Sequence, residues 1–169
     1  MSAKFFVIRQ HCSTGFATLH PRTMPQPFTY RLRVRYHECD GQKIVFNARY
    51  AEYIDIAALE YARHIFGSTD AKSGGIDWRL VNQHLQWRAP AHFDDVLDVA
   101  VHTKSLGTTS FCLIAEVSRL GESDVLVRAE TTYVVYDEAT ASKAPIPELA
   151  RDPLLGGAPG VVINCSGHV

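Results

Sequence analysis

The sequence predicts one α+β domain in which a long helix packs against an antiparallel sheet. It contains one uninterrupted helical pattern, several alternating patterns typical of strands, and short glycine-containing connections between the later strands. At 169 residues the chain has the length of a single domain. No helical pattern separates the later strands, so the doubly wound and barrel folds of the α/β class are excluded.

The first strand is expected at residues 30–37. Apolar and charged residues alternate from Tyr30 to His37, which is the period of a strand with one buried face. The intervening Arg31, Arg33 and Arg35 are expected to lie on the solvated face of this strand.

The long helix is expected at residues 48–66. Asn47 is a good N-cap residue, Gly67 is a typical left-handed stop, and no proline interrupts the span. Apolar residues cover more than one stripe of this helix, so we expect it to be covered on several sides.

Four more strands are expected, at residues 78–87, 96–105, 110–119 and 123–136. The connections at 107–109 and 120–122 are short and contain glycine. The last three strands should therefore form an antiparallel meander.

The ends of the chain are expected to lie outside the domain. Residues 1–27 contain three prolines and no sustained period, which predicts a loosely structured extension. The domain itself is expected at residues 28–150, and residues 151–169 read as a compositionally loose C-terminal tail.

Composition limits the possible partners. A net charge of -1 provides no general field for nucleic acid, and no apolar run approaches the roughly 20 residues of a membrane span. The four cysteines and eight histidines are scattered without metal-site spacing, so no metal and no cofactor are expected. The spacing of the cysteines does not suggest a dense disulfide framework, and the start has too few apolar residues for a secretory signal; both favour a cytoplasmic protein.

The segment RVRYHECDGQKIVFNARYAEYIDIAALEYAR, residues 33–63, resembles the signature of the 4-hydroxybenzoyl-CoA thioesterase-like branch of hotdog proteins. In that branch a strand ends in an aspartate, a short turn follows, and an Asn-Ala-x-Tyr-like segment opens the central helix. Asp40, Asn47, Ala48 and Tyr50 match at the same spacing. The later segments WRAPAHFDDVLDV and YVVYDEATASKAPIP also resemble the family, and the likeness covers about residues 28–150.

The resemblance implies a hotdog fold, with one long central helix wrapped by a five- or six-stranded antiparallel sheet. It also implies an acyl-CoA thioesterase that releases free acid and CoA, and that works as a homodimer or a dimer of dimers. The chain departs from the family pattern in one place. The family usually has glycine three residues after the aspartate, where this chain has Lys43, and Gly41 is the candidate for the flexible point of the turn instead.

The resemblance places the catalytic residues Asp40, Asn47 and Tyr50 around the start of the helix. Free amides at a helix N-terminus attract negative charge, so the amides of residues 46–50 are expected to polarise the thioester carbonyl. Asp40 would either attack the carbonyl directly or hold the attacking water, and the sequence leaves both roles open.

Other side chains are candidates for the same role. Glu52 and Glu60 lie on the helix, where another branch of the fold carries its carboxylate, but solvated helix glutamates are commoner. His37 and Cys39 flank Asp40 without an evident orienting partner, so a Cys-His nucleophile pair is disfavoured.

Substrate contacts are expected from residues of three kinds. Aromatic residues would line an apolar acyl pocket, cations would contact the phosphates of CoA, and a hydroxyl would bond near the thioester. These candidates are Phe46, Tyr53 and Trp87, then Arg88 and Lys104, then Ser110.

Two other functions remain open on the same fold. A non-catalytic acyl-CoA-binding module would not need Asp40. A hydratase or dehydratase would need a paired aspartate and histidine, and no local Asp-x-x-x-x-His pattern is present. The acyl group, and the choice between CoA and an acyl carrier protein as its carrier, are also left open.

Overall fold

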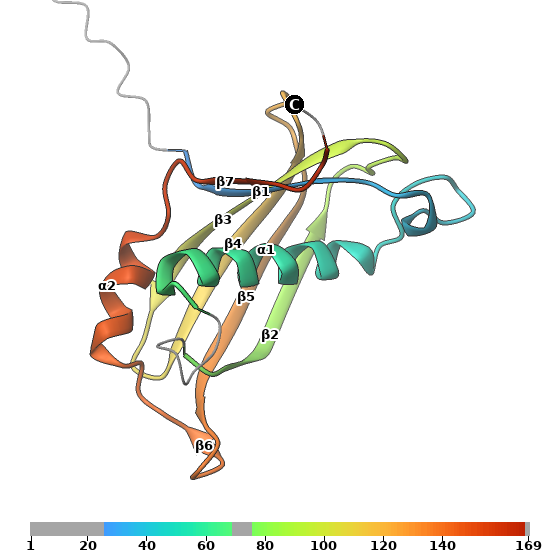
Figure 1. Ribbon diagram of the computed structural model, residues 1–169. Helices are drawn as coiled ribbons and strands as arrows, with labels where there is room; N and C mark the ends of the chain where they lie inside the picture. The colour runs from blue at the N-terminus through green and yellow to red at the C-terminus, as the bar shows by residue number, and fades with distance from the viewer. Residues whose placement is uncertain (1–25, 69–75, 168–169) are drawn as a thin grey trace, which may run out of the picture.

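The computed structural model describes residues 26–68 and 76–167, which form a seven-stranded sheet with one long helix across one face (Figure 1). The strand order is β2-β5-β4-β3-β1-β7, and β6 pairs with β5. The elements are β1 (Phe28–Arg33), the 3-10 helix η1 (Tyr36–Glu38), α1 (Arg49–Phe66), β2 (Trp78–Trp87), β3 (Val96–Leu106), β4 (Ser110–Arg119), β5 (Val125–Asp137), β6 (Ser142–Lys143), α2 (Glu148–Gly156) and β7 (Val162–Asn164).

The antiparallel meander is confirmed. β3 pairs with β4 and β4 pairs with β5, both antiparallel, while β2 joins the free side of β5. The sheet differs from the expected one in two ways: it has seven strands, and it is mixed because β7 runs parallel to β1.

The first strand is shorter than the alternation predicts. It ends at Arg33, because the Val34 amide donates to the Asp95 carbonyl and the Val34 carbonyl accepts from the Asp94 amide. The chain then turns into η1, which leaves Tyr36 83% exposed. The alternation alone does not reveal that β1 ends at Arg33, because the backbone groups of Val34 pair with the loop before β3 instead of continuing the sheet.

Helix α1 ends as predicted but begins differently. Gly67 has a left-handed φ of 70° and stops the helix. The N-cap is Ala48, in helical conformation and without a side-chain cap bond, so the prediction of Asn47 as N-cap is wrong. No side chain at the N-cap accepts a hydrogen bond from the free backbone amides at this end of α1.

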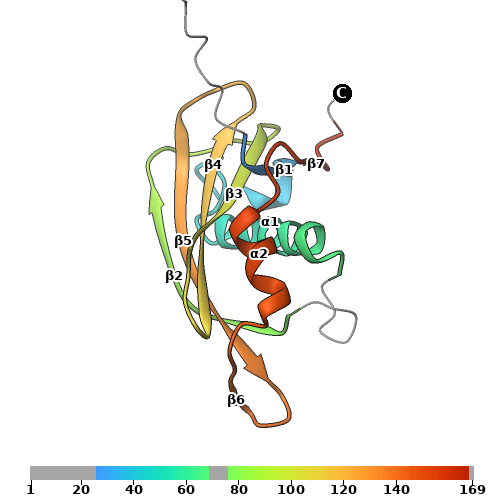
Figure 2. The ribbon, with the colours of Figure 1, turned by 90° about the vertical axis from the view of Figure 1, so that its left-hand side faces the viewer.

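One stripe of α1 is buried, against β1, β3 and α2 (Figure 2). Leu97 and Val99 of β3 are fully buried in the same core, and burying each such side chain contributes roughly 1.5–3 kcal/mol to folding. The expectation that α1 is covered on several sides is not met within one chain, because Ile56 and Leu59 are about 40% exposed on its other side.

The C-terminal segment belongs to the domain, which corrects the prediction of a loose tail at residues 151–169. Helix α2 packs beside α1 and β3 and buries Leu154 almost completely. β7 then pairs with β1 from Thr29 to Arg31. Of the predicted N-terminal extension, residues 1–25 lie outside the part that the structure describes.

Candidate active site

The turn that carries Asp40 is a tight hairpin between β1 and α1. Cys39 and Val45 form a bridge across it, the Asp40 amide donates to the Ile44 carbonyl at 2.9 Å, and the Lys43 amide donates to the Asp40 carbonyl at 2.9 Å. Lys43 has a left-handed φ of 65°. The expectation that Gly41 is the flexible point is therefore wrong, because Gly41 does not adopt a positive φ and Lys43 itself takes the conformation that glycine favours.

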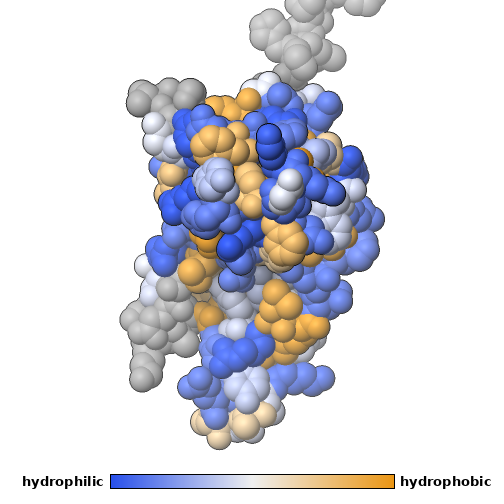
Figure 3. Space-filling view, turned by 90° about the vertical axis from the view of Figure 1, so that its right-hand side faces the viewer, coloured by the Kyte–Doolittle hydropathy of each residue, from blue (hydrophilic) through white to orange (hydrophobic). Residues whose placement is uncertain are grey.

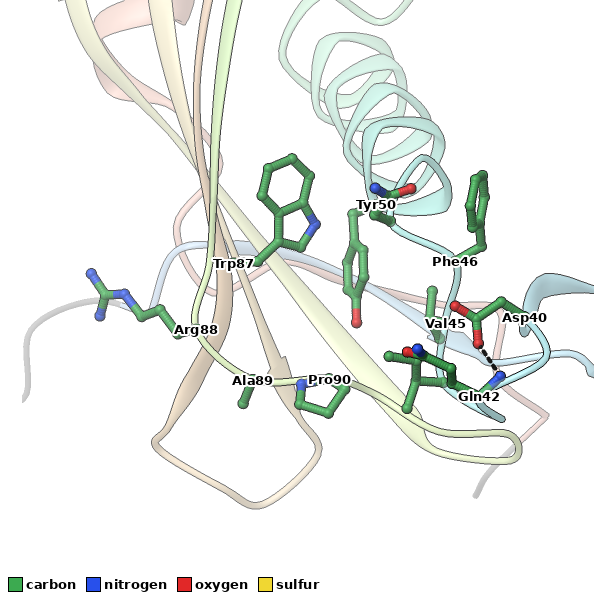
Figure 4. A pocket seen from close by; sticks show the side chains of 11 residues that line it. Asp40, Gln42, Val45, Phe46, Tyr50, Trp87, Arg88, Ala89 and Pro90 are labelled. Carbon is green, nitrogen blue, oxygen red and sulfur yellow. Dashed lines mark hydrogen bonds between the residues drawn. The ribbon is translucent and has the colours of Figure 1, made fainter.

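The Asp40 carboxylate is partly committed to this turn. Its Oδ1 accepts from the Gln42 amide at 2.8 Å, an Asx-turn contact drawn in Figure 4. Its second oxygen accepts no hydrogen bond from any residue in the described ranges 26–68 and 76–167. One carboxylate oxygen is thus held in place, and the other is available to a ligand.

The amides at the start of α1 are only partly free. The Phe46 amide donates to the Glu38 carbonyl at 2.9 Å and the Arg49 amide donates to the Phe46 carbonyl at 2.8 Å. The amides of Asn47 and Ala48 make no hydrogen bond to another described residue. Of the amides at 46–50 that were expected to polarise the thioester carbonyl, those of Asn47 and Ala48 are therefore the best candidates, because they lie unbonded at the positive end of the helix dipole.

A pocket of about 430 Å³ lies between this turn, the start of α1 and the end of β2. Figure 4 shows the Tyr50 ring between Trp87 on one side and Asp40 and Gln42 on the other. Its lining residues are Asp40, Gln42, Ile44, Val45, Phe46, Asn47, Tyr50, Trp87, Arg88, Ala89 and Pro90.

Tyr50 connects the helix start to the opposite wall. Its hydroxyl oxygen accepts from the Ala91 amide at 2.9 Å, and the ring is buried. A tyrosine hydroxyl is already protonated at neutral pH, and burial raises the pKa of Tyr50 further, so this group has a proton to donate as well as an oxygen that accepts.

Four of the other predicted residues also line the pocket. Phe46, Asn47 and Trp87 line the pocket with Asp40 and Tyr50, and Phe46 and Trp87 are half exposed at its rim. Arg88 also lines it, but its side chain extends away from Tyr50 and Trp87 (Figure 4). It forms no ion pair with another residue that the structure describes.

Three predicted substrate contacts lie elsewhere. Tyr53 is buried, and its ring packs against the Tyr50 ring. Burial and the nearby Glu38 carboxylate raise the pKa of its hydroxyl. This hydroxyl has no hydrogen-bond partner in the part of the chain that the structure describes. Lys104 pairs with Glu130 at 2.6 Å. Ser110 begins β4, opposite Val134 of β5, so neither Lys104 nor Ser110 lines this pocket.

The alternative candidates Glu52, Glu60 and Cys39 are less suited to the catalytic role. Glu52 pairs with Arg49 at 2.5 Å on the exposed side of α1, and Glu60 pairs with Arg63. Burial, with the Glu38 and Asp40 carboxylates nearby, raises the pKa of the Cys39 thiol. A raised pKa disfavours the thiolate that a cysteine nucleophile needs.

Five lining residues were missed at the level of sequence: Gln42, Ile44, Val45, Ala89 and Pro90. Ala89 and Pro90 directly follow the predicted residues Trp87 and Arg88, so the segment WRAP was the available signal. The contact that brings it to the turn, a bridge between Ile44 and His92, joins positions 48 apart and leaves no local pattern.

The model of the thioesterase superfamily matches residues 42–126 of the chain. Among curated proteins, the 1,4-dihydroxy-2-naphthoyl-CoA hydrolase of a Synechocystis species is 26% identical over 123 residues, 72% of this chain and 89% of that protein. The acyl-CoA thioester hydrolase YbgC of Escherichia coli is 28% identical over 106 residues, which cover 59% of this chain and 79% of YbgC.

Solved structures have the same architecture. A 1,4-dihydroxy-2-naphthoyl-CoA thioesterase from Synechocystis superposes with a TM-score of 0.66 at 24% identity, over 75% of this chain and 94% of that one. The hotdog fold expected from the sequence is confirmed. Within the described ranges, no helix is both long and apolar enough to cross a membrane.

Proposed function

We propose, from the premise that this chain belongs to the thioesterase superfamily, that it hydrolyses an acyl-CoA to the free acid and CoA. The observation that carries the proposal is the free Asp40 carboxylate oxygen in a pocket that also contains the start of α1. A carboxylate can activate water or attack a carbonyl, and free helix amides can stabilise the oxyanion that results.

In the proposed reaction the substrate carbonyl oxygen accepts from the amides of Asn47 and Ala48. Asp40 then takes a proton from water as the hydroxide adds to the carbonyl carbon; the C–S bond breaks and the proton passes to the CoA thiolate. Alternatively, Asp40 itself adds, CoA leaves as the thiolate, and water hydrolyses the resulting anhydride. Both routes use the same carboxylate oxygen and the same amides.

The acyl group is proposed to lie against Phe46, Tyr50 and Trp87. Their aromatic faces suit an apolar or aromatic acyl chain, and the named relatives act on a naphthoyl-CoA and on acyl-CoA. Arg88 is proposed to meet the phosphates of CoA outside the pocket mouth, since its guanidinium is free of ion pairs among the described residues. Tyr53, Lys104 and Ser110 are proposed to act only through packing and sheet contacts.

The test is thiol release from a panel of aromatic, medium-chain and long-chain acyl-CoA and acyl carrier protein thioesters. Asp40→Asn should lower kcat by about 100-fold or more, because general-base or nucleophilic carboxylates contribute at least that much. Asp137→Asn is the matched control: Asp137 Oδ1 accepts from the Ala139 amide at 2.9 Å in the same kind of turn, outside the pocket.

Each outcome separates the candidates. Equal activity of Asp40→Asn and Asp137→Asn would remove Asp40 from the reaction. Saturable acyl-CoA binding without thiol release by the parent would favour the binding module, and water addition to an enoyl-CoA would favour the hydratase.

We further propose that two copies pair, as a dimer or as a dimer of dimers. β2 is an edge strand of the sheet, with Leu80 and Val81 about half exposed, and Ile56 and Leu59 of α1 are exposed as well. Hydrophobic side chains are also visible among hydrophilic ones on the face at which α1 begins (Figure 3). Such edges and apolar surfaces are usually covered by a partner. Sedimentation equilibrium that gives a monomer at micromolar concentration would contradict pairing.

A cytoplasmic location is part of the same proposal. Cys39, Cys112 and Cys165, the cysteines that the structure describes, are free thiols, as a reducing compartment favours. Fractionation of cells that express the tagged chain, with a cytoplasmic and an exported marker, tests this location.

A further inference from the structure

The connection from β2 to β3, residues 88–95, forms one wall of the pocket and is held at several points. The amides of Arg88 and Ala89 both donate to the Leu126 carbonyl of β5, at 2.8 and 3.2 Å. The Ala91 carbonyl accepts from the Val45 amide of the Asp40 hairpin at 2.9 Å. Together with the Tyr50 hydroxyl, these contacts place the connection between the sheet and the start of α1.

A single guanidinium fastens both ends of this connection. Arg119, the last residue of β4, donates from Nε to Asp95 Oδ2 at 2.8 Å and from a terminal nitrogen to the Pro90 carbonyl at 2.6 Å. A third contact reaches Glu122 at 3.3 Å. The Arg119 and Asp95 side chains are each about three-quarters buried, so water competes weakly for these bonds.

The partner carboxylate is fixed in its turn. Asp95 Oδ2 also accepts from the His92 amide at 2.9 Å, and the Asp95 backbone carbonyl accepts from Val34. The Asp95 carboxylate raises the pKa of Arg119 further, so the cation persists at any pH at which the protein works. Pro90 can therefore shift only if the Arg119 contacts break or rearrange.

We propose that Arg119 is a positioning residue of the active site. By holding the Pro90 carbonyl, it sets where the Ala91 amide meets Tyr50 and where the Trp87–Pro90 wall stands relative to Asp40. The inference rests on the proposed thioesterase function, because movement of this wall would displace the thioester carbonyl and so lower the rate of hydrolysis. A displacement of about 1 Å in a reacting group can cost roughly 100-fold in rate.

The chain offers a matched control on the same strands. Arg128 of β5 donates from Nε to Glu116 of β4 at 3.3 Å; this pair is partly buried, though more exposed than Arg119 and Asp95, and neither residue lines the pocket. Arg128→Gln removes an arginine–carboxylate pair from the sheet without touching residues 88–95. It reports what the loss of such a pair does to stability alone.

The experiment compares Arg119→Gln and Arg119→Lys with Arg128→Gln, all carrying Trp78→Phe. The chain has two tryptophans, so Trp87 is then the only one and its acrylamide quenching reports the pocket wall. Trp78 packs among aromatic rings, which makes phenylalanine a conservative replacement. Both kcat and KM are measured on the best acyl-CoA of the panel, and folding is followed by circular dichroism.

Arg119→Gln is expected to change Trp87 quenching and to lower kcat/KM at least 10-fold, mainly through kcat. Arg119→Lys can keep the ion pair with Asp95 but cannot bond to Asp95 and the Pro90 carbonyl at once in the planar geometry of a guanidinium. Its quenching and its kcat/KM should therefore lie between those of Arg119→Gln and the parent. Arg128→Gln should match the parent in quenching and in kcat.

If folded Arg119→Lys, or folded Arg119→Gln, equals Arg128→Gln in both quenching and kinetics, the positioning role is overturned. A parent that releases no thiol from any thioester would sink the proposed function instead. In that case quenching still decides whether Arg119 sets the wall, so the two failures can be told apart.

Discussion

At the scale of single residues, the hydrogen bond from the Ala91 amide to the Tyr50 hydroxyl joins two segments that are far apart in the chain. Tyr50→Phe removes the acceptor and leaves a buried N–H without a partner, at a cost of about 1–3 kcal/mol. We expect the free energy of unfolding, measured by urea denaturation, to fall by that amount. Tyr36→Phe, at an exposed tyrosine, should leave it unchanged; equal effects of the two variants would show that the Ala91 contact adds nothing.

Lys43 keeps a left-handed φ that disfavours residues with a Cβ. Lys43→Gly removes this strain but adds freedom to the unfolded chain, so the net gain in stability should be up to about 1 kcal/mol. Activity should be retained because the turn is unchanged. Gly41→Ala is the comparison: a Cβ there meets open space and no left-handed φ, so little change is expected. Destabilisation by Lys43→Gly in the same urea titration would contradict this account.

The residues of the site were predictable to the extent that they are local. Asp40, Phe46, Asn47 and Tyr50 lie within eleven positions, and a turn followed by a helix start brings them together without further information. Gln42 was missed because it lines the pocket only through the bend of the hairpin. Lys104 does not line the pocket, because it pairs with the Glu130 carboxylate two strands away in the sheet, and its charge alone did not reveal that pairing.

At the scale of elements, periodicity was enough for β2 and β4, whose observed bounds are the predicted ones. The same criterion missed α2 and β7. Helix α2 is short and contains Pro153, while β7 has three residues and gains its order from parallel pairing with β1, about 130 positions earlier. Non-local pairing of this kind leaves no repeat in the segment itself.

Helix α2 should therefore contribute to the stability of the whole domain. Leu154→Ala removes a side chain that is 1% exposed against α1 and the sheet, and it should cost about 2–5 kcal/mol. Leu155→Ala, on the adjacent exposed position of the same helix, should cost far less. Thermal unfolding of the pair checks this; similar melting temperatures would mean that the segment after residue 150 is dispensable, as a tail would be.

At the scale of the whole molecule, alkali should unfold the protein through its core tyrosines. Burial raises the pKa of Tyr30 to about 12, and it also raises the pKa of Tyr50, Tyr53, Tyr61 and Tyr133. The unfolded chain loses these protons near pH 10 while the native state keeps them, so stability falls as pH rises above about 10.

We expect tyrosinate absorbance in an alkaline titration to show a step of five tyrosines that coincides with the loss of circular dichroism. Below about pH 10 these five groups should have no effect on stability, because both states hold the protons. Ionisation of the buried tyrosines while the circular dichroism stays native would contradict the prediction.

The connection of residues 88–95 leaves the sheet at its β2 edge and re-enters it three strands away at β3. That gap is about 14 Å at the usual strand spacing, whereas eight extended residues can reach roughly 27 Å, so the connection is longer than the gap alone requires. Residues can therefore be added to or removed from this connection without disturbing the β-ladder on either side. Insertion or deletion in residues 88–95 is therefore a route by which the substrate range of the pocket can change, provided that Ala91 and Asp95 keep their hydrogen bonds.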